Sequence, residues 1–80
     1  MNEIKLGKYK HYKGQFYVVM SIARDSGTLK ELVVYKGLYD SDKFGKNPVW
    51  VRPKKEFLEN VNLNEDVIPR FVFVGEEWKF

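Results

Sequence analysis

The apolar and polar positions of the chain follow the two-residue period of β-strands. From Gly7 to Tyr12, Tyr9 and His11 alternate with Lys8 and Lys10, a pattern typical of a strand with one buried face. The pair Lys13-Gly14 then indicates a tight turn, because glycine adopts positive φ without steric cost. We expect Tyr9 and His11 to point inward.

Further strands follow, each bounded by turn residues. The segment 16–23 is apolar on both faces, which favours a central strand over an edge strand. Clusters of Asp, Ser, Gly and Asn at 24–30 and 40–48 indicate loops. The remaining strands are expected at 31–39, 49–52, 61–63 and 67–74, the last two forming a hairpin around Asn64-Glu65-Asp66.

Prolines punctuate the second half of the chain. Pro53 ends the strand at 49–52, because proline lacks the donor that a strand ladder needs. The segment 53–59 predicts one helical turn with Pro53 at its first position. Pro69 lies inside the last expected strand and indicates an edge or a bulge there.

These elements together predict an all-β fold. Short strands with a single helical turn are typical of a small closed barrel, here of about five to six antiparallel strands. Eighty residues leave room for one core, so we expect a single domain over 1–80. Aromatic residues make up 16% of the chain, and each buried ring removes roughly 150–250 Å² from water. Such a core can fold without disulfides or metals.

The composition narrows the chemistry. The chain has no cysteine and one histidine, His11, so we expect no metal site and no cofactor. A nucleophilic triad needs a positioned histidine and acid, and nothing in the sequence brings His11 together with Asp25 and Ser26. We therefore predict a protein that is not an enzyme.

The compartment is predicted from the same features. Absence of cysteine fits the cytoplasm, and the first residues hold no apolar run long enough for a signal peptide. Charges and prolines interrupt every apolar segment, so no membrane span is expected. We interpret the chain as a soluble cytoplasmic protein.

Four short motifs occur in a fixed order along the chain. They are Gly7-Lys-Tyr-Lys-His-Tyr-Lys-Gly14, Leu32-Val-Val-Tyr35, Trp50-Val-Arg-Pro53 and Pro69-Arg-Phe71. Together they resemble the bacterial domain-of-unknown-function family 1653, over about residues 7–73. The resemblance implies an SH3-like small barrel and no established activity. Relatives often carry Ala-x-His-Ser-Glu-Thr after the second strand, where this chain has Ala23-Arg-Asp-Ser-Gly-Thr28. A function that requires that His or Glu is therefore not predicted, whereas hydrogen bonds from Ser26 or Thr28 to the loop backbone are.

Aromatic and cationic residues suggest a binding surface. Tyr35 and Tyr39 share a strand face by their even spacing, as do Trp50 and Arg52. Such groups stack on bases or prolines and hold acidic groups in a bidentate fork. The predicted docking site for a protein segment comprises Tyr35, Tyr39, Trp50, Arg52, Arg24, Arg70 and His11. The alternative is a structural role, with the rings in the core and Arg52 and Arg70 paired with Glu31 or Glu59.

Nucleic acid is the alternative partner. Residues 1–14 hold four lysines against one glutamate, and residues 41–55 hold five cations against one aspartate, whereas 56–80 hold six acids against two cations. Two basic segments on one face would attract an anion, although lysines on strand edges also discourage aggregation. The lysines of the basic segments 5–13 and 43–55 that would contact single-stranded nucleic acid are Lys8, Lys10, Lys13, Lys43, Lys46, Lys54 and Lys55.

Overall fold

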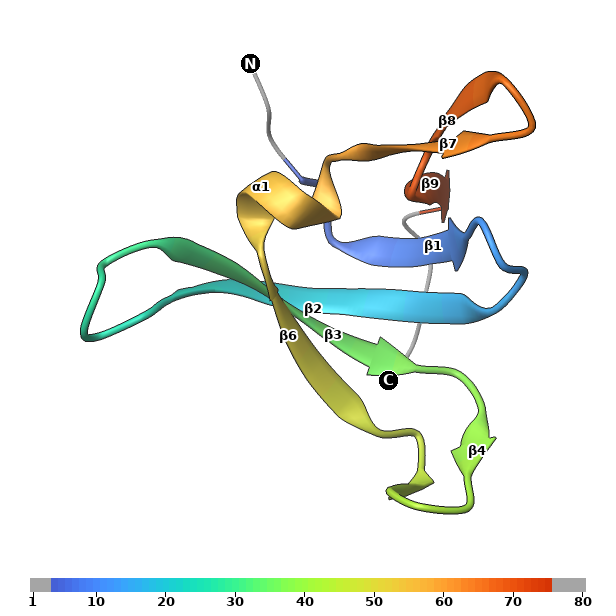
Figure 1. Ribbon diagram of the computed structural model, residues 1–80. Coiled ribbons are helices and arrows are strands. Elements are labelled where there is room, and N and C mark those ends of the chain that lie inside the picture. The colour runs from blue at the N-terminus through green and yellow to red at the C-terminus, as the bar shows by residue number, and fades with distance from the viewer. Residues whose placement is uncertain (1–3, 76–80) are drawn as a thin grey trace.

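The computed structural model describes residues 4–75. Its largest element is a five-stranded antiparallel sheet with the strand order β6-β3-β2-β1-β9 (Figure 1). Two small two-stranded sheets, β4-β5 and β7-β8, and one short helix complete the fold. The prediction of a mostly β fold with one helical turn is confirmed. The elements are β1 (Gly7–His11), β2 (Phe16–Arg24), β3 (Glu31–Gly37), β4 (Asp40–Ser41), β5 (Gly45–Lys46), β6 (Val49–Pro53), α1 (Lys54–Phe57), β7 (Asn60–Leu63), β8 (Asp66–Pro69) and β9 (Phe71–Gly75).

Strand β2 lies in the middle of the sheet, between β1 and β3, as its apolar sequence predicts. Val18 and Val19 point to opposite faces and both are fully buried. The register between β2 and β3 shifts after Val19, so that Met20 forms a bulge. Because one extra residue exchanges the two faces of a strand, Ile22 pairs with Val33 on the inner face.

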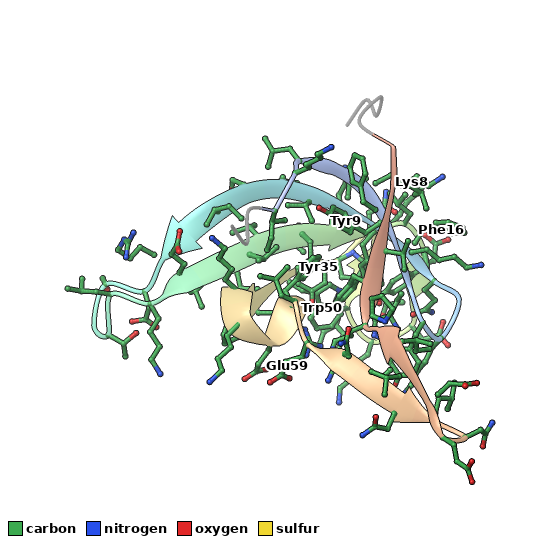
Figure 2. The ribbon with its side chains drawn as sticks, turned by 90° about the horizontal axis from the view of Figure 1, so that it is seen from above. Lys8, Tyr9, Phe16, Tyr35, Trp50 and Glu59 are labelled. Atoms are coloured by element: carbon green, nitrogen blue, oxygen red, sulfur yellow. The ribbon has the colours of Figure 1, made fainter. Side chains whose placement is uncertain are left out.

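The core is a cluster of aromatic rings on the inner face of the sheet. Figure 2 shows Tyr9 and Tyr35 inside the curve of the sheet, with Lys8 and Phe16 at its margin. The buried members of the cluster are Tyr9, Tyr17, Val19, Val33, Tyr35, Phe57 and Phe71. Most ring pairs meet edge to face, which is the favoured geometry for aromatic side chains.

One contact connects the two ends of the sheet. The end strands β6 and β9 are not paired with each other in the described part of the chain. Instead Phe57, from the helix that follows β6, stacks on Phe71 of β9 with ring centroids 4.1 Å apart and planes within 5°. Tyr9 and Tyr35 meet the edges of the Phe57 ring at 5.3 and 5.6 Å. The side chain of Phe57 therefore closes the sheet that the backbone leaves open.

Four predicted boundaries differ from the structure. The strand expected at 31–39 ends at Gly37. Pro53 does not begin the helix: its φ of −53° and ψ of 138° are extended, it pairs with Leu32 as the last residue of β6, and α1 starts at Lys54. The polar connection at 40–48 contains the β4-β5 hairpin. The last expected strand divides at Arg70 into β8 and β9.

The division at Arg70 has a physical cause. The Arg70 N–H donates to the Glu59 carbonyl at 3.1 Å, while the Arg70 carbonyl accepts from the Tyr12 N–H at 3.0 Å. One residue thus connects the β7-β8 hairpin on one side to the main sheet on the other. The hairpin turns at Asn64 and Glu65, which both have positive φ, as two-residue hairpin turns require.

We predict that Phe57→Ala destabilises the protein by about 3–5 kcal/mol, the usual cost of removing a buried phenylalanine. Phe57 is 2% exposed, and the change removes the ring that joins the two ends of the sheet. Chemical denaturation followed by circular dichroism measures the free energy of unfolding. Val67→Thr is the control, because Val67 is 63% exposed in the β7-β8 hairpin; an equal loss in both variants would contradict the assigned role.

Candidate binding site

Five rings line one end of the sheet in unbroken contact. Phe44 meets Trp50 edge to face at 5.3 Å, and Trp50 Nε1 donates a hydrogen bond to the Tyr39 hydroxyl at 3.0 Å. Tyr39 in turn meets Tyr17 at 5.7 Å, and Tyr17 meets His11 at 6.1 Å. We call Phe44, Trp50, Tyr39, Tyr17 and His11 the aromatic row. Phe44 is 59% exposed, Trp50, Tyr39 and His11 are half-buried, and Tyr17 is buried.

Gly37 makes room for the row. A Cβ atom at this position would lie 2.5 Å from Cε2 of Tyr39, far inside van der Waals contact. The Tyr39 ring has little freedom to move away, because it contacts Tyr17 and accepts the Trp50 hydrogen bond. Gly37 therefore allows Tyr39, which follows β3, to fold back over the end of the strand.

Two arginines, Arg52 and Arg70, lie near His11 at the end of the row. Arg52 Cζ lies 6.0 Å from the centroid of Phe71, and the His11 ring meets the same ring at 4.8 Å. Arg70 precedes Phe71 in the chain, and its carbonyl accepts a hydrogen bond from the N–H of Tyr12, the residue after His11. We call His11, Arg52 and Arg70 the cationic cluster, after its two arginines. Its members come from β1, β6 and the link between β8 and β9.

The arginines of the cluster have partial partners. Arg52 Nε donates to the Tyr35 hydroxyl at 3.2 Å, and Arg52 Nη1 lies 3.8 Å from Glu56 Oε1. Arg70 Nη2 lies 3.9 Å from Glu59 Oε1, the pairing expected from the sequence. Both carboxylate distances exceed those of hydrogen bonds. Within the described residues, the buried Nε atom of Arg70 has no hydrogen-bond partner.

The surroundings of His11 favour its neutral form. Burial lowers the pKa of His11 below its ordinary value, and the positive charges of Arg52, Arg70 and Lys13 lower it further. Nδ1 of His11 accepts a hydrogen bond from the Lys13 N–H at 3.2 Å, which places the proton of the neutral ring on Nε2. Burial and the neighbouring Tyr39 raise the pKa of Tyr17, so this hydroxyl, like the His11 ring, is favoured in its neutral form.

The structure brings six of the seven predicted docking residues together. Tyr39, Trp50, His11, Arg52 and Arg70 belong to the row or the cluster, whereas Tyr35 is 5% exposed and lies in the core. Its hydroxyl holds Arg52 in place, so Tyr35 contributes to the site only through Arg52. The rings of Tyr35 and Tyr39 both contact Tyr17, but Tyr39 lies beyond the end of β3 and not on its face. The predicted common face of Trp50 and Arg52 is confirmed, because both pair with residues on the inner face of β3.

Arg24 lies elsewhere. It ends β2, and its Nη1 donates to the Leu29 carbonyl at 2.6 Å within the β2-β3 loop, which Figure 1 shows extending away from the remaining strands. Asp25 shapes the loop by accepting the N–H groups of Gly27 and Thr28 at 2.8 and 3.0 Å, and these bonds lower its pKa. The expected hydrogen bond of Thr28 is confirmed, since its hydroxyl accepts the Lys30 N–H.

The predicted nucleic-acid lysines belong to several elements. Lys8 and Lys10 lie over the Phe16 ring at 4.6 and 5.8 Å, and Lys13 lies over Tyr12 in the following turn. Lys43 and Lys46 are in the β4-β5 hairpin, and Lys54 and Lys55 are in α1. Figure 1 shows the hairpin and the helix at different ends of the molecule. Lys54 also pairs with Glu31 at 3.4 Å.

A shallow groove beside α1 does not add to the site. Its walls carry charges of both signs, including Lys30, Glu31, Lys55 and Glu56. Mixed charge of this kind favours neither an anionic nor a cationic ligand. The groove also excludes every member of the aromatic row and of the cationic cluster.

The family model of a protein of unknown function, DUF1653, matches residues 7–73. The chain belongs to the DUF1653 family. A crystal structure of a DUF1653 protein from Bordetella bronchiseptica is 31% identical, with a TM-score of 0.83 over 100% of this chain and 99% of that chain. The comparison with curated proteins gives no match. The resemblance expected from the four motifs is therefore confirmed. No helix within residues 4–75 of this DUF1653 protein is long and apolar enough to cross a membrane.

Sequence reasoning missed three residues of this DUF1653 site. Phe44 lies in a polar segment that reads as a loop, and its place in the row depends on the β4-β5 hairpin. Tyr17 and Phe71 lie in strands whose other residues are also apolar, so no pattern distinguishes them. One signal could have indicated Phe44. It is the single aromatic residue in the polar segment 40–48, and such a residue either packs on a neighbouring side chain or is exposed at the surface.

We predict that His11 titrates below its ordinary pKa of 6.5, and that Arg52→Gln and Arg70→Gln each raise this pKa. As pH falls from about 7, the unfolded chain binds the proton before the folded one, so the free energy of unfolding decreases until the folded-state pKa is passed. Proton NMR measures the titration directly, because His11 is the single histidine. A pKa at or above 6.5 would contradict the described surroundings.

Proposed function

We propose that this DUF1653 protein is a non-catalytic binding module that docks an extended protein segment along the aromatic row. The observation that supports this most directly is the unbroken contact from Phe44 to His11. Proline and apolar side chains stack on such rings in known peptide-recognition grooves. The exposed edge belongs to Phe44 and the half-buried Trp50 and Tyr39.

The row is well prepared for binding. A hydrogen bond joins Trp50 to Tyr39, and the Tyr39 ring packs closely over the backbone of Gly37. Rings that are already ordered lose little conformational freedom when a ligand arrives. Arg52, on the same strand face as Trp50, supplies a charged group beside the apolar contact.

Binding is proposed in preference to catalysis because of the setting of His11. A catalytic histidine is oriented by a carboxylate and accepts a proton from a nucleophile. Among residues 4–75, the charged groups that act on His11 are all cationic, and its Nδ1 accepts a backbone N–H. We further propose a bacterial cytoplasmic location, which the absence of cysteine supports.

We predict that peptides selected from a random displayed library against the intact chain bind at the row. Phe44→Ser should weaken a selected synthetic peptide at least tenfold in a fluorescence anisotropy titration, and Trp50→Ala should weaken it at least as much. Leu63→Ser is the control, because Leu63 is 45% exposed in the β7-β8 hairpin. Amide NMR spectra establish that each variant is folded. Unchanged affinity in both row variants would refute the proposal.

Single-stranded nucleic acid is the second candidate, and one observation favours it. Lys8 and Lys10 surround the ring of Phe16, which is 36% exposed on the outer face of the sheet. Cations beside an exposed ring are the usual means of binding phosphates and stacking bases without sequence preference.

If the second candidate is correct, Phe16→Ala and Lys10→Gln weaken the binding of a mixed-sequence single-stranded oligonucleotide. The affinity should also fall with salt, with a slope of about −0.7 per neutralised phosphate. An NMR titration at low and moderate salt measures both effects. Absence of binding at low salt, or binding that salt leaves unchanged, would remove nucleic acid as a partner.

A further inference from the structure

We propose that the cationic cluster binds one carboxylate, supplied by an aspartate or glutamate of the segment that docks on the aromatic row. This inference rests on the proposed docking function and specifies the segment that is recognised: an acidic residue next to apolar or proline residues.

Both arginines have hydrogen-bond donors that no carboxylate within residues 4–75 occupies. Arg52 uses Nε for the Tyr35 hydroxyl, and this bond fixes the plane of its guanidinium group. Among residues 4–75, the carboxylate oxygen nearest to Arg52 is on Glu56, 3.8 Å away. The nearest to Arg70, on Glu59, lies 3.9 Å away. Neither distance is that of a hydrogen bond, so both guanidinium groups keep donors for a ligand.

The two arginines are less exposed to solvent than the glutamates near them. The side chains of Arg52 and Arg70 are 30% and 24% exposed, whereas those of Glu56 and Glu59 are 53% and 47% exposed. The glutamates are therefore the more exposed partners, and ion pairs with such exposed carboxylates contribute little to stability. A ligand carboxylate that approaches from the row meets partly desolvated guanidinium groups, for which charge-assisted hydrogen bonds are stronger.

His11 and Phe71 lie next to the arginines and complete the surroundings of the anion. His11, in its neutral form, presents the Nε2 proton as a further donor, because Nδ1 accepts from Lys13. The Phe71 ring is shared by His11 and Arg52, which keeps the donors on one apolar support. A planar guanidinium fork matches a carboxylate, and the adjoining aromatic row fits a peptide. These features favour an acidic side chain of a protein over a free phosphate.

The test uses the intact chain with N-acetylglutamate as the probe and N-acetylglutamine as its matched uncharged control. We expect saturable NMR shifts of the His11 ring and of Arg52 Nε with the first compound and none with the second. Arg52→Gln, Arg70→Gln and the charge-conserving Arg52→Lys should each reduce the shifts at least fivefold. Arg24→Gln is the matched control and should change nothing, because Arg24 is bound within its own loop.

Three outcomes would overturn the inference: equal shifts with both compounds, shifts unaffected in the folded Arg70→Gln variant, or stronger binding of inorganic phosphate than of N-acetylglutamate. A second measurement separates this inference from the docking function. Each acidic residue of a selected peptide is replaced by its amide, which should weaken binding at least tenfold. Peptides that bind the row equally well with the amide refute the carboxylate subsite and leave the docking function standing.

Discussion

The stack of Phe57 on Phe71 is the contact on which the rest of this structure depends. A five-stranded sheet with unpaired end strands buries its inner face only if something spans the gap between those ends. Here the span is a side chain, delivered by a helix of four residues that directly follows the end strand β6. The helix is too short to be stable alone, so its position comes from the burial of Phe57 among Tyr9, Tyr35 and Phe71. Helix and sheet therefore stabilise each other.

The same closure assembles the candidate site. Phe71 contacts Phe57 within the core, and it also contacts His11 and Arg52 at the margin. One ring thus connects the stability of the fold with the placement of the cationic groups. Tyr35 has a comparable position, with its ring in the core and its hydroxyl on Arg52. Phe71 and Tyr35 thus belong both to the core and to the surroundings of the site. For this reason the sequence could not assign the aromatic residues to one role or the other.

Local patterns were sufficient to predict most strands and five of the seven residues of the aromatic row and the cationic cluster. Alternation correctly placed Tyr9 inward, and even spacing correctly placed Trp50 and Arg52 on one face. The bulge at Met20, the extended Pro53 and the break at Arg70 depend on pairing with distant strands, which no local pattern records. For the same reason Phe44 was missed and Arg24 was included: the first folds back onto Trp50, whereas the second lies in a loop that extends away from the site. The lysines of the basic segment 43–55 are likewise divided between the β4-β5 hairpin and α1, which lie at different ends of the molecule (Figure 1).

The β7-β8 hairpin has a consequence for engineering. Its strands pair only with each other in the described sheet arrangement, most of its residues are exposed, and its base is tied by the bond between Arg70 and Glu59. A segment held only at its base tolerates changes of length and composition at its tip. Insertion of an epitope or a fluorophore-binding sequence between Asn64 and Glu65 would therefore leave the ring cluster, the aromatic row and the cationic cluster intact, and would make the domain a small carrier that reports on its own binding.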